Sequence, residues 1–240
     1  MQLLIQHSVG RGLTLPINYQ HILQSIIFRH LQQVPEYGSL LHDKGFGNDK
    51  RKFKLFTFGP ICGKYQLSDK KIMFYDSVSW EVRCAEPYVL KLLLESIRKN
   101  GLVYGMQEYT DVEVRLEDRE VQTDEIRIKM LSPVCVYATD RDSGKTKYFS
   151  PESEEFSVRV NENFRRKYCA YSGVEADSDV ILQPLWVAAR DKYVTKYKYF
   201  YITAWKGKYV LRGKRKYLDF LYQTGLGSKN SQGFGMFEVE

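Results

Sequence analysis

A glycine-rich stretch near residue 240 has the spacing best suited to holding a phosphate. It reads Gly225-Leu-Gly-Ser-Lys-Asn-Ser-Gln-Gly-Phe-Gly-Met236 and holds four of the 17 glycines of the chain. Glycine adopts positive φ and lets another backbone approach closely, and a turn rich in it can aim backbone N–H groups at an anion. Polar and basic side chains occupy its centre: Ser228, Lys229, Asn230 and Ser231. The stretch therefore predicts either a phosphate cradle or a plain structural turn.

A dinucleotide-binding fingerprint is excluded for this stretch. The pattern Gly-x-Gly-x-x-Gly needs a third glycine where Asn230 stands, and a helix must follow it. Here residues 234–239 follow, and their apolar and polar residues alternate as in a strand.

His42 is the best placed of the four histidines for proton transfer. It lies in a polar loop predicted over residues 34–52, between Leu41 and Asp43. Histidine titrates near neutrality and can take or give a proton, although a lone loop histidine is usually inert. His42 and Asp43 could instead form a metal-binding pair. The sequence shows no further His/Asp cluster at ligand spacing, so we expect neither a metal nor another cofactor.

A window of basic and aromatic residues offers a surface for nucleic acid. Residues 190–216 hold ten bases and one acid, so the window carries +9 against +7 for the whole chain. Tyrosines and Trp205 alternate with the bases, and such rings can stack on nucleobases while the bases contact phosphates. A solvated charged face is the alternative. We predict RNA contacts at Lys196, Lys198 and Lys208.

Composition is that of an ordinary globular chain. The 240 residues are 43% hydrophobic and 27% charged, enough for one large domain or two of about 120. No apolar run approaches the roughly 20 residues that span a bilayer, and no signal peptide is evident at the start. The four cysteines are scattered without a Cys-x-x-Cys pair, so we expect reduced, buried thiols, a cytoplasmic protein and no membrane partner.

The predicted elements follow the same order twice. In the first half we expect strands at residues 1–9, 53–58, 63–67, 72–75, 78–84 and 102–116, with helices at 18–32 and 86–100. In the second half we expect strands at 125–138, 180–188 and 234–239, strands joined by a turn of unassigned position within 193–211, and helices at 150–168 and 214–224. This order predicts an α+β fold with two tandem ferredoxin-like domains. We place the first, with the histidine loop, at residues 1–120 and the second, with the glycine-rich loop, at 121–240.

The glycine-rich spacing also resembles a known family. Gly-x-Gly-x-x-Asn-Ser-x-Gly-Phe-Gly-Met is similar to the C-terminal loop of CRISPR-associated repeat-RNA endoribonucleases, the Cas-six family. These belong to the RAMP superfamily of tandem ferredoxin-like RNA-binding proteins. Residues 15–29 resemble the family's first helix, and residues 37–58 resemble its histidine loop and following strand. Residues 131–133 resemble the start of its second domain.

The resemblance implies a function and site residues. It implies metal-independent cleavage of CRISPR precursor RNA within the repeat, leaving a 5′-OH and a 2′,3′-cyclic phosphate. His42 matches the family's catalytic position. Lys54 matches the lysine that stabilises charge, although without the resemblance it reads as a strand-edge lysine facing solvent. Tyr37 is an alternative proton-transfer group in the same loop. The implied RNA-binding residues of the glycine-rich loop are Gly225, Gly227, Lys229, Asn230, Ser231, Gly233 and Gly235.

Phe28 departs from the family pattern. Many members carry a tyrosine there, and phenylalanine cannot transfer a proton. A non-cleaving RNA-binding subunit of an interference complex is therefore an alternative, and a ferredoxin-like RNA module outside CRISPR systems is a third. His30 fits a packed or capping histidine. Expected partners are CRISPR repeat RNA, other Cas subunits and a second copy of the chain.

Overall fold

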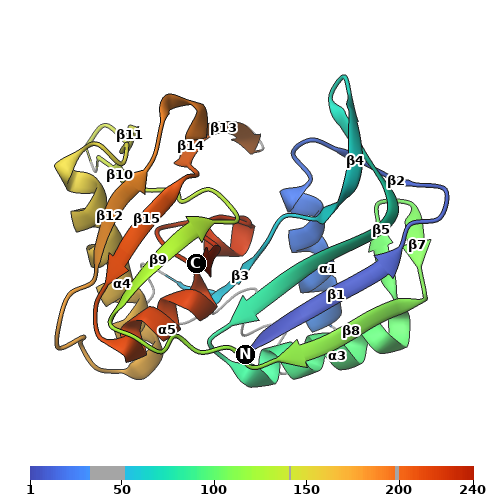
Figure 1. Ribbon diagram of the computed structural model, residues 1–240, viewed down its shortest axis with the longest axis horizontal. Coiled ribbons are helices and arrows are strands. Elements are labelled where there is room, and N and C mark those ends of the chain that lie inside the picture. Colours follow the sequence, from blue (N-terminus) through green and yellow to red (C-terminus); the bar gives the residue numbers. More distant parts are fainter. Residues whose placement is uncertain (33–51, 141, 198–199) are drawn as a thin grey trace.

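Two α+β halves lie side by side in the computed structural model, which describes residues 1–32, 52–140, 142–197 and 200–240 (Figure 1). The first half is blue to green and the second yellow to red, with the N-terminus where the halves meet and the C-terminus within the second half. Each half follows the strand and helix order β-α-β-β-α-β with short additions, which is the ferredoxin-like order. The predicted α+β fold with two tandem ferredoxin-like domains is confirmed.

The first half is organised around one long central strand. Its strands are β1 (Gln2–Ser8), β2 (Leu13–Pro16), β3 (Phe56–Phe58), β4 (Cys62–Ser68), β5 (Lys71–Cys84) and β8 (Val112–Glu117), and its helices are α1 (Gln20–Gln32) and α3 (Pro87–Asn100). The sheet path runs β2-β5-β1-β8, and β3 and β4 also pair with β5. A small hairpin, β6 (Leu102–Tyr104) and β7 (Gln107–Tyr109), follows α3.

Apolar packing of α1 and α3 on the sheet forms the first core. Leu23 and Ile27 of α1 and Leu93 of α3 are buried in one cluster with Leu3 and Ile5 of β1. The helical positions follow the spacing of one face, and the strand positions alternate with exposed residues. Burial of each large apolar side chain stabilises the fold by about 1.5–3 kcal/mol.

The second half repeats this architecture. Its sheet runs β12-β15-β9-β16. The strands are β9 (Glu125–Met130), β12 (Ile181–Trp186), β15 (Lys208–Arg212) and β16 (Phe237–Val239), and the helices are α4 (Glu154–Ser172) and α5 (Arg215–Thr224). Phe156 and Phe164 of α4 are buried with Tyr209 of β15. Leu55 and Ala85 of the first half join this core, so the halves share apolar contacts.

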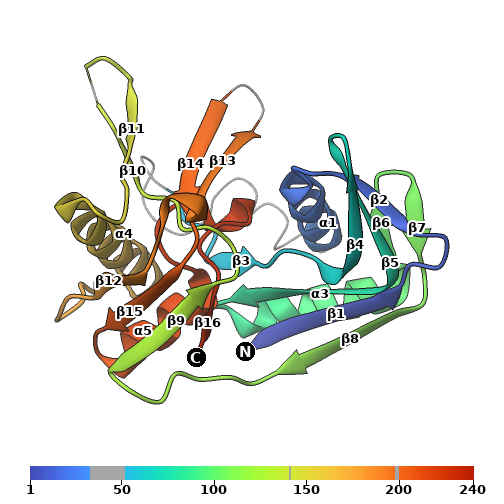
Figure 2. The ribbon, with the colours of Figure 1, turned by 45° about the horizontal axis from the view of Figure 1, so that its top comes forward.

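Two hairpins extend the second half. They are β10 (Tyr137–Thr139) with β11 (Thr146–Tyr148), and β13 (Lys192–Tyr197) with β14 (Phe200–Trp205). Figure 2 shows both hairpins projecting toward the same side of the second half. A third buried cluster lies at their bases and contains Cys135, Ile202, Ala204 and Phe234. Two 3₁₀ turns, η2 (Ala189–Asp191) and η3 (Asn230–Gln232), complete the half.

Several predicted strand boundaries were wrong. The two strands expected at 72–75 and 78–84 are one strand, β5. The irregularity between them is a bulge, with Asp76 at φ 61° and a register shift opposite it between Gly63 and Lys64, and β5 pairs with β4 on both sides of this bulge. The strand expected at 102–116 is three strands, since the chain turns at Gly105 with φ 65°. The strand expected at 125–138 also divides, into β9 and β10, whereas residues 193–211, where we expected strands with a turn between them, form β13, β14 and the start of β15. The boundary between residues 120 and 121 stays a prediction, and it lies between β8 and β9.

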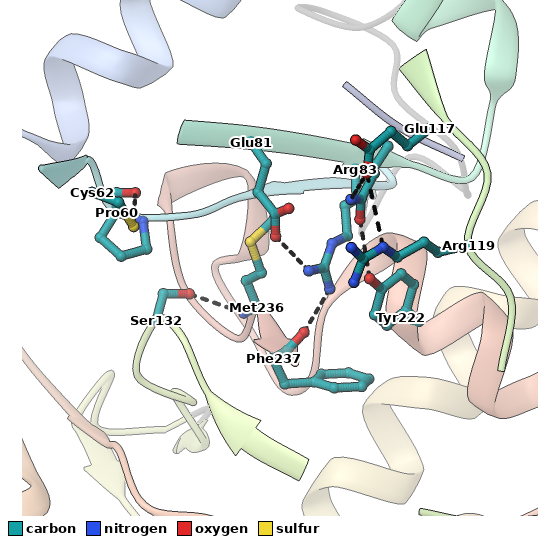
Figure 3. Close-up of polar contacts among 11 residues, drawn as sticks. Pro60, Cys62, Glu81, Arg83, Glu117, Arg119, Ser132, Tyr222, Met236 and Phe237 are labelled. Carbon is teal, nitrogen blue, oxygen red and sulfur yellow. Dashed lines mark hydrogen bonds and ion pairs between the residues drawn. The ribbon is translucent and has the colours of Figure 1, made fainter. Parts of the chain in front are cut away.

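Arg83 joins the two halves beside the cores (Figure 3). It lies on β5, is 2% exposed, and forms an ion pair with Glu81. Its Nη1 donates to the carbonyl of Phe237 on β16 at 2.6 Å, and its Cζ lies 3.9 Å from the ring centroid of Tyr222 on α5. The Tyr222 hydroxyl in turn donates to Gln2 at 3.0 Å. One guanidinium group therefore links a strand of the first half to a strand and a helix of the second.

We predict that Arg83→Met lowers the free energy of unfolding by about 3–5 kcal/mol, the usual loss when one partner of a buried ion pair is removed. Urea unfolding of the purified protein measures the loss. Arg115→Met is the matched control, because Arg115 is 57% exposed and pairs with Glu117 at 3.2 Å. We expect it to cost at most about 1 kcal/mol. A loss below about 1 kcal/mol for Arg83→Met would contradict this role.

Candidate functional site

The glycine-rich loop begins where α5 ends and closes on itself. The Gly225 N–H caps α5 by donating to Leu221 at 2.7 Å. The Leu226 N–H donates to the Gly235 carbonyl at 2.8 Å, so the two ends of the loop meet. Asn230 spans the interior, its Nδ2 donating to the carbonyls of Leu226 at 2.9 Å and Phe234 at 3.1 Å. Asn230 therefore holds the loop together from inside.

The four glycines of the loop have no room for a side chain, as Gly235 and Gly233 show. A Cβ at Gly235 would lie 2.0 Å from the Leu226 carbonyl oxygen, and one at Gly233 would lie 2.7 Å from the Phe58 ring. Both residues have positive φ, 79° and 85°. The glycine spacing is thus required by the close approach of the protein's own segments, which is the structural role that the sequence left open.

The loop is also bound to the first half. The Thr57 hydroxyl of β3 donates to the Phe234 carbonyl at 3.2 Å, and Gln24 of α1 donates to the Ser231 carbonyl at 2.7 Å. Nearby, Gln20 donates to the Tyr193 hydroxyl of β13 at 3.0 Å. Residues far apart in sequence are therefore brought to one place between the halves.

A cavity of about 420 Å³, here called the cationic cavity, lies at this junction. It is lined by residues 52–56 of the first half, residues 136–139, Arg159, Asn163, Arg166 and Lys167 of α4, and residues 224 and 227–232 of the glycine-rich loop. Among these described lining residues six side chains are basic and none is acidic. The cavity suits a phosphate, because clefts lined by one sign of charge concentrate the opposite charge.

Several polar atoms beside the cavity have no partner in the described chain. Arg159 Nε, Asn163 Oδ1 and Gln232 Oε1 are buried without a hydrogen bond. No described residue accepts from the N–H groups of Asn230 and Ser231 at the start of η3. Native proteins satisfy most buried polar groups, so this concentration is typical of a site that binds a polar ligand.

Lys54 lines the cationic cavity beside Phe28. Its Nζ lies 5.0 Å from the Phe28 ring centroid, and Phe28 packs edge-on against Phe56 at 5.8 Å between centroids. The residue at position 28 is therefore next to the predicted charge-stabilising lysine. Lys229, also on the lining, lies with its Nζ 5.1 Å from the Tyr137 ring centroid.

The other predicted catalytic residues, Tyr37 and His42, lie outside the described residues, as does Lys198. The three described histidines have structural contacts. His7 meets the Tyr104 hydroxyl at 3.1 Å and His30 meets Ser96 at 2.8 Å, and burial lowers the pKa of both. His21 is exposed and contacts the Asn18 carbonyl at 2.8 Å. In the described part of the chain, no three His, Cys, Asp or Glu residues lie together as a metal site.

The basic window is divided by folding. Its later bases pair with acids that are distant in sequence: Lys208 with Glu240, Arg212 with Glu125, Lys214 and Lys216 with Asp177, and Arg215 with Glu120. Lys196 is exposed on β13 and lines a cavity of about 330 Å³ with Gln20 and Gln232. The bases of residues 190–216 therefore do not form one continuous cationic surface. The predicted RNA contacts of Lys196 and Lys208 stay predictions.

Sequence reasoning missed the basic face of α4. Arg159, Asn163, Arg166 and Lys167 all line the cationic cavity. Their spacing of four and then three or four residues places them on one helix face, and that spacing could have identified them. The acidic residues interspersed in the helix obscured it.

Lys167 of α4 binds the glycine-rich loop from its buried side. It is 2% exposed, and its Nζ donates to the Gly225 carbonyl at 2.6 Å and to Asn230 Oδ1 at 3.2 Å. No acid of the described chain pairs with it. Burial lowers the pKa of Lys167 to about 7, because removal from water disfavours the charged form.

Fold and cavity together define a tandem ferredoxin-like protein with a cationic, loop-bounded site between its domains. The sequence profile of the family described as CRISPR associated protein Cas6, C-terminal, matches residues 116–239, just over half of the chain. The chain belongs to the Cas6 family, as the sequence predicted. No helix in the described residues is long and apolar enough to cross a membrane.

Individual relatives agree with this assignment. The chain is 27% identical, over 99% of its length and 88% of the relative, to the CRISPR-associated endoribonuclease Cas6 of Pyrococcus furiosus. It is 25% identical to the CRISPR-associated endoribonuclease Cas6 1 of Methanocaldococcus jannaschii, over 92% of this chain and 86% of the relative. A solved structure of a Cas6-related protein from Pyrococcus furiosus has a TM-score of 0.82 at 21% identity, with 100% of this chain and 98% of the other covered. That structure supports the fold.

We predict that Gly233→Ala destabilises the protein by about 1–3 kcal/mol beyond the cost of positive φ, because the new Cβ would overlap the Phe58 ring. Gly173→Ala is the matched control: its φ is +75° and nothing lies within 4 Å of an added Cβ. Unfolding in urea compares the two. In a Phe58→Leu background the extra penalty of Gly233→Ala should shrink. Equal costs for the two glycines would show that the contact is unimportant.

The titration of Lys167 predicts a pH dependence of stability. Its folded pKa of about 7 lies below its ordinary value of 10.5, so the unfolded chain binds more protons between these values. The free energy of unfolding contributed by Lys167 should therefore rise with pH across that window and be lowest below pH 7.

Urea unfolding at several pH values measures this effect as the difference between wild type and Lys167→Met. We expect the stability of wild type relative to the variant to increase from pH 7 to pH 10. Lys99→Met, at an exposed position on α3, should give a flat difference. A flat difference for Lys167→Met as well would contradict the lowered pKa.

Proposed function

We propose that this protein is an endoribonuclease that cuts CRISPR precursor RNA within the repeat. The observation that carries the proposal is the cationic cavity, where Lys54 and the glycine-rich loop, both predicted from the sequence, line one site. Membership of the Cas6 family and two relatives named as endoribonucleases support it. The repeat RNA is the proposed partner, and its scissile phosphate would lie in this cavity.

The proposed chemistry needs no metal. The ribose 2′-oxygen attacks the adjacent phosphorus, the bond from phosphorus to the 5′-oxygen breaks, and the products carry a 2′,3′-cyclic phosphate and a 5′-OH. His42 takes the proton from the 2′-OH or gives one to the leaving oxygen, and Tyr37 is a second candidate for proton transfer. Lys54 stabilises the negative charge that develops on the phosphorane.

The glycine-rich loop would hold the RNA backbone. The N–H groups of Asn230 and Ser231 lack a described acceptor, and Lys229 lines the same cavity. Backbone N–H groups in such turns bind phosphate oxygens. Gly225, Gly227, Gly233 and Gly235 would contribute by allowing the turn rather than by contacting RNA directly.

A non-cleaving RNA-binding subunit is the second candidate, and Phe28 favours it. The Phe28 ring is beside Lys54, at the position where the family resemblance leads us to expect a tyrosine. An RNA held there would lack one proton-transfer group. Other Cas subunits and a second copy of the chain stay predicted partners under either function. We also propose a cytoplasmic location, which the four free thiols support, although Cys62 is exposed and Cys169 half-buried where we expected buried thiols.

We predict that repeat RNA is cut in excess EDTA and that one 2′-deoxy substitution just 5′ of the scissile phosphate abolishes cleavage. The deoxy sugar removes the attacking hydroxyl and leaves the phosphates for binding. His42→Ala should slow cleavage by about 10²–10⁴-fold, the usual contribution of a general acid or base, with RNA affinity retained. Single-turnover rates on labelled RNA and a filter-binding assay provide both readouts.

His21→Ala is the matched histidine control, because His21 is exposed and, among described residues, its ring hydrogen-bonds only with the Asn18 carbonyl; its rate should equal that of wild type. Cleavage of the deoxy substrate at the all-ribose rate would refute attack by the 2′-oxygen. Tight binding by wild type without cleavage under any condition would instead support the non-cleaving subunit.

A further inference from the structure

Trp186 is an exposed aromatic residue at the end of an edge strand. It closes β12, the outer strand of the second sheet, and 72% of its surface is exposed. Large aromatic side chains are usually at least half buried in proteins. Its exposure is therefore a feature that the core does not explain.

The sheet register places basic residues next to Trp186. It pairs with Lys208 of β15, which pairs with Lys129 of β9, and directly paired residues project from the same face of a sheet. Arg190 of η2 and Lys206, before β15, complete the surroundings. A cavity of about 610 Å³ is lined by Trp186 and these four bases, with Met130, Leu131, Asp191 and Gly207.

The backbone around Trp186 is held tightly. Gly207 has φ +107°, and a Cβ there would lie 2.8 Å from the Trp186 carbonyl oxygen. The Lys206 N–H donates to the Asp191 carbonyl at 2.8 Å, and the Tyr209 hydroxyl donates to the Lys206 carbonyl at 3.0 Å. The backbone that carries the indole is thus rigid, which lowers the entropy lost when a ligand stacks on the ring.

Two of the four bases are available for a ligand. Lys129 pairs with Glu238 at 2.9 Å and Lys208 with Glu240 at 2.5 Å. The Asp191 carboxylate accepts the Ala188 N–H at 2.8 Å. Arg190 and Lys206 have no acidic partner among the described residues. An anion can therefore meet Arg190 and Lys206 without breaking an ion pair.

An exposed aromatic ring beside basic side chains that have no ion pair among the described residues matches single-stranded RNA. The nucleobases of such RNA stack on aromatic side chains, while its phosphates contact Arg and Lys. An added β-strand is a poorer occupant. Pro184 lies within β12 and cannot donate a ladder hydrogen bond, which is how edge strands avoid pairing.

We infer that Trp186, Arg190 and Lys206 form a second RNA subsite, in which the indole stacks on a base and the two cations hold a neighbouring phosphate. The ligand is a single-stranded part of the RNA whose cleavage is proposed above, and the inference rests on that proposed function. The subsite shares no lining residue with the cationic cavity. It therefore contributes to affinity and leaves the chemical step unchanged.

Binding of repeat RNA with the 2′-deoxy substitution, which keeps it intact, tests the subsite. Trp186→Ala should weaken binding by about 5- to 150-fold, the loss typical of one stacked base, and Trp186→Phe should restore most of it. Arg190→Ala with Lys206→Ala should reduce the slope of log affinity against log salt by about 0.7, since the two cations hold one phosphate and each neutralised phosphate of a single strand contributes about 0.7. The cleavage rate at saturating all-ribose RNA should stay at the wild-type value for all of these variants.

Two controls match the variants in kind. Met106→Ala removes an apolar side chain that is 99% exposed, and Lys91→Ala with Lys99→Ala removes two exposed cations from α3. Both should bind as wild type does. Stern–Volmer quenching by iodide adds a direct readout, because RNA should shield the exposed Trp186 indole in wild type and this shielding should disappear in Trp186→Phe.

The outcomes separate the subsite from the proposed function. If wild type cuts repeat RNA but every Trp186, Arg190 and Lys206 variant binds it with wild-type affinity, the subsite is refuted and the function stands; the surface would then suit an acidic protein segment. If wild type binds RNA and does not cut it, the cleavage proposal fails, and the affinities of the variants still decide the subsite. If wild type neither binds nor cuts repeat RNA, both proposals fail.

Discussion

The close fit of the glycine-rich loop against the first domain is the contact on which the functional site depends. At Gly233 the loop backbone lies so near Phe58 that a Cβ would come within 2.7 Å of the ring, and Gln24 of α1 binds the Ser231 carbonyl. The cationic cavity takes one wall from each domain, so it exists only while the domains keep this arrangement. Arg83 strengthens the same arrangement through β16 and α5.

Folding, more than local sequence, decides which charges are available to a ligand. The bases at the end of the basic window are compensated by acids more than twenty residues away in sequence, as Lys208 is by Glu240 and Arg212 by Glu125. The cationic cavity gathers basic residues from three separate segments, with no acid among its described lining residues. Pairing of surface charges contributes little to stability, but it removes cations from the set that can meet phosphates.

The sequence predicted the family, both ferredoxin-like domains and the glycine-rich loop, because these depend on local periodicity and on a specific spacing of residues. Strand divisions were missed where single residues turn the chain, as Gly105 does between β6 and β7. Lys167 was not predicted, since a buried lysine gives no apolar signal and its acceptors, Gly225 and Asn230, are 58 and 63 residues away. Lys54 was predicted only from the family resemblance, because its position beside Phe28 depends on tertiary contacts.

The phosphate cradle and the structural turn, which are alternatives in the sequence, are compatible in the structure. The glycine Cα atoms face the protein itself at Gly233 and Gly235, where a side chain would collide with Phe58 or with Leu226. The N–H groups of Asn230 and Ser231 have no described acceptor, and Lys167 donates to the loop from the buried side. Packing therefore fixes one side of the loop and leaves donors on the other. Replacing a glycine alters both sides at once, whereas side chains on the cavity lining, such as Lys54 and Lys229, can be changed without disturbing the packing that builds the site.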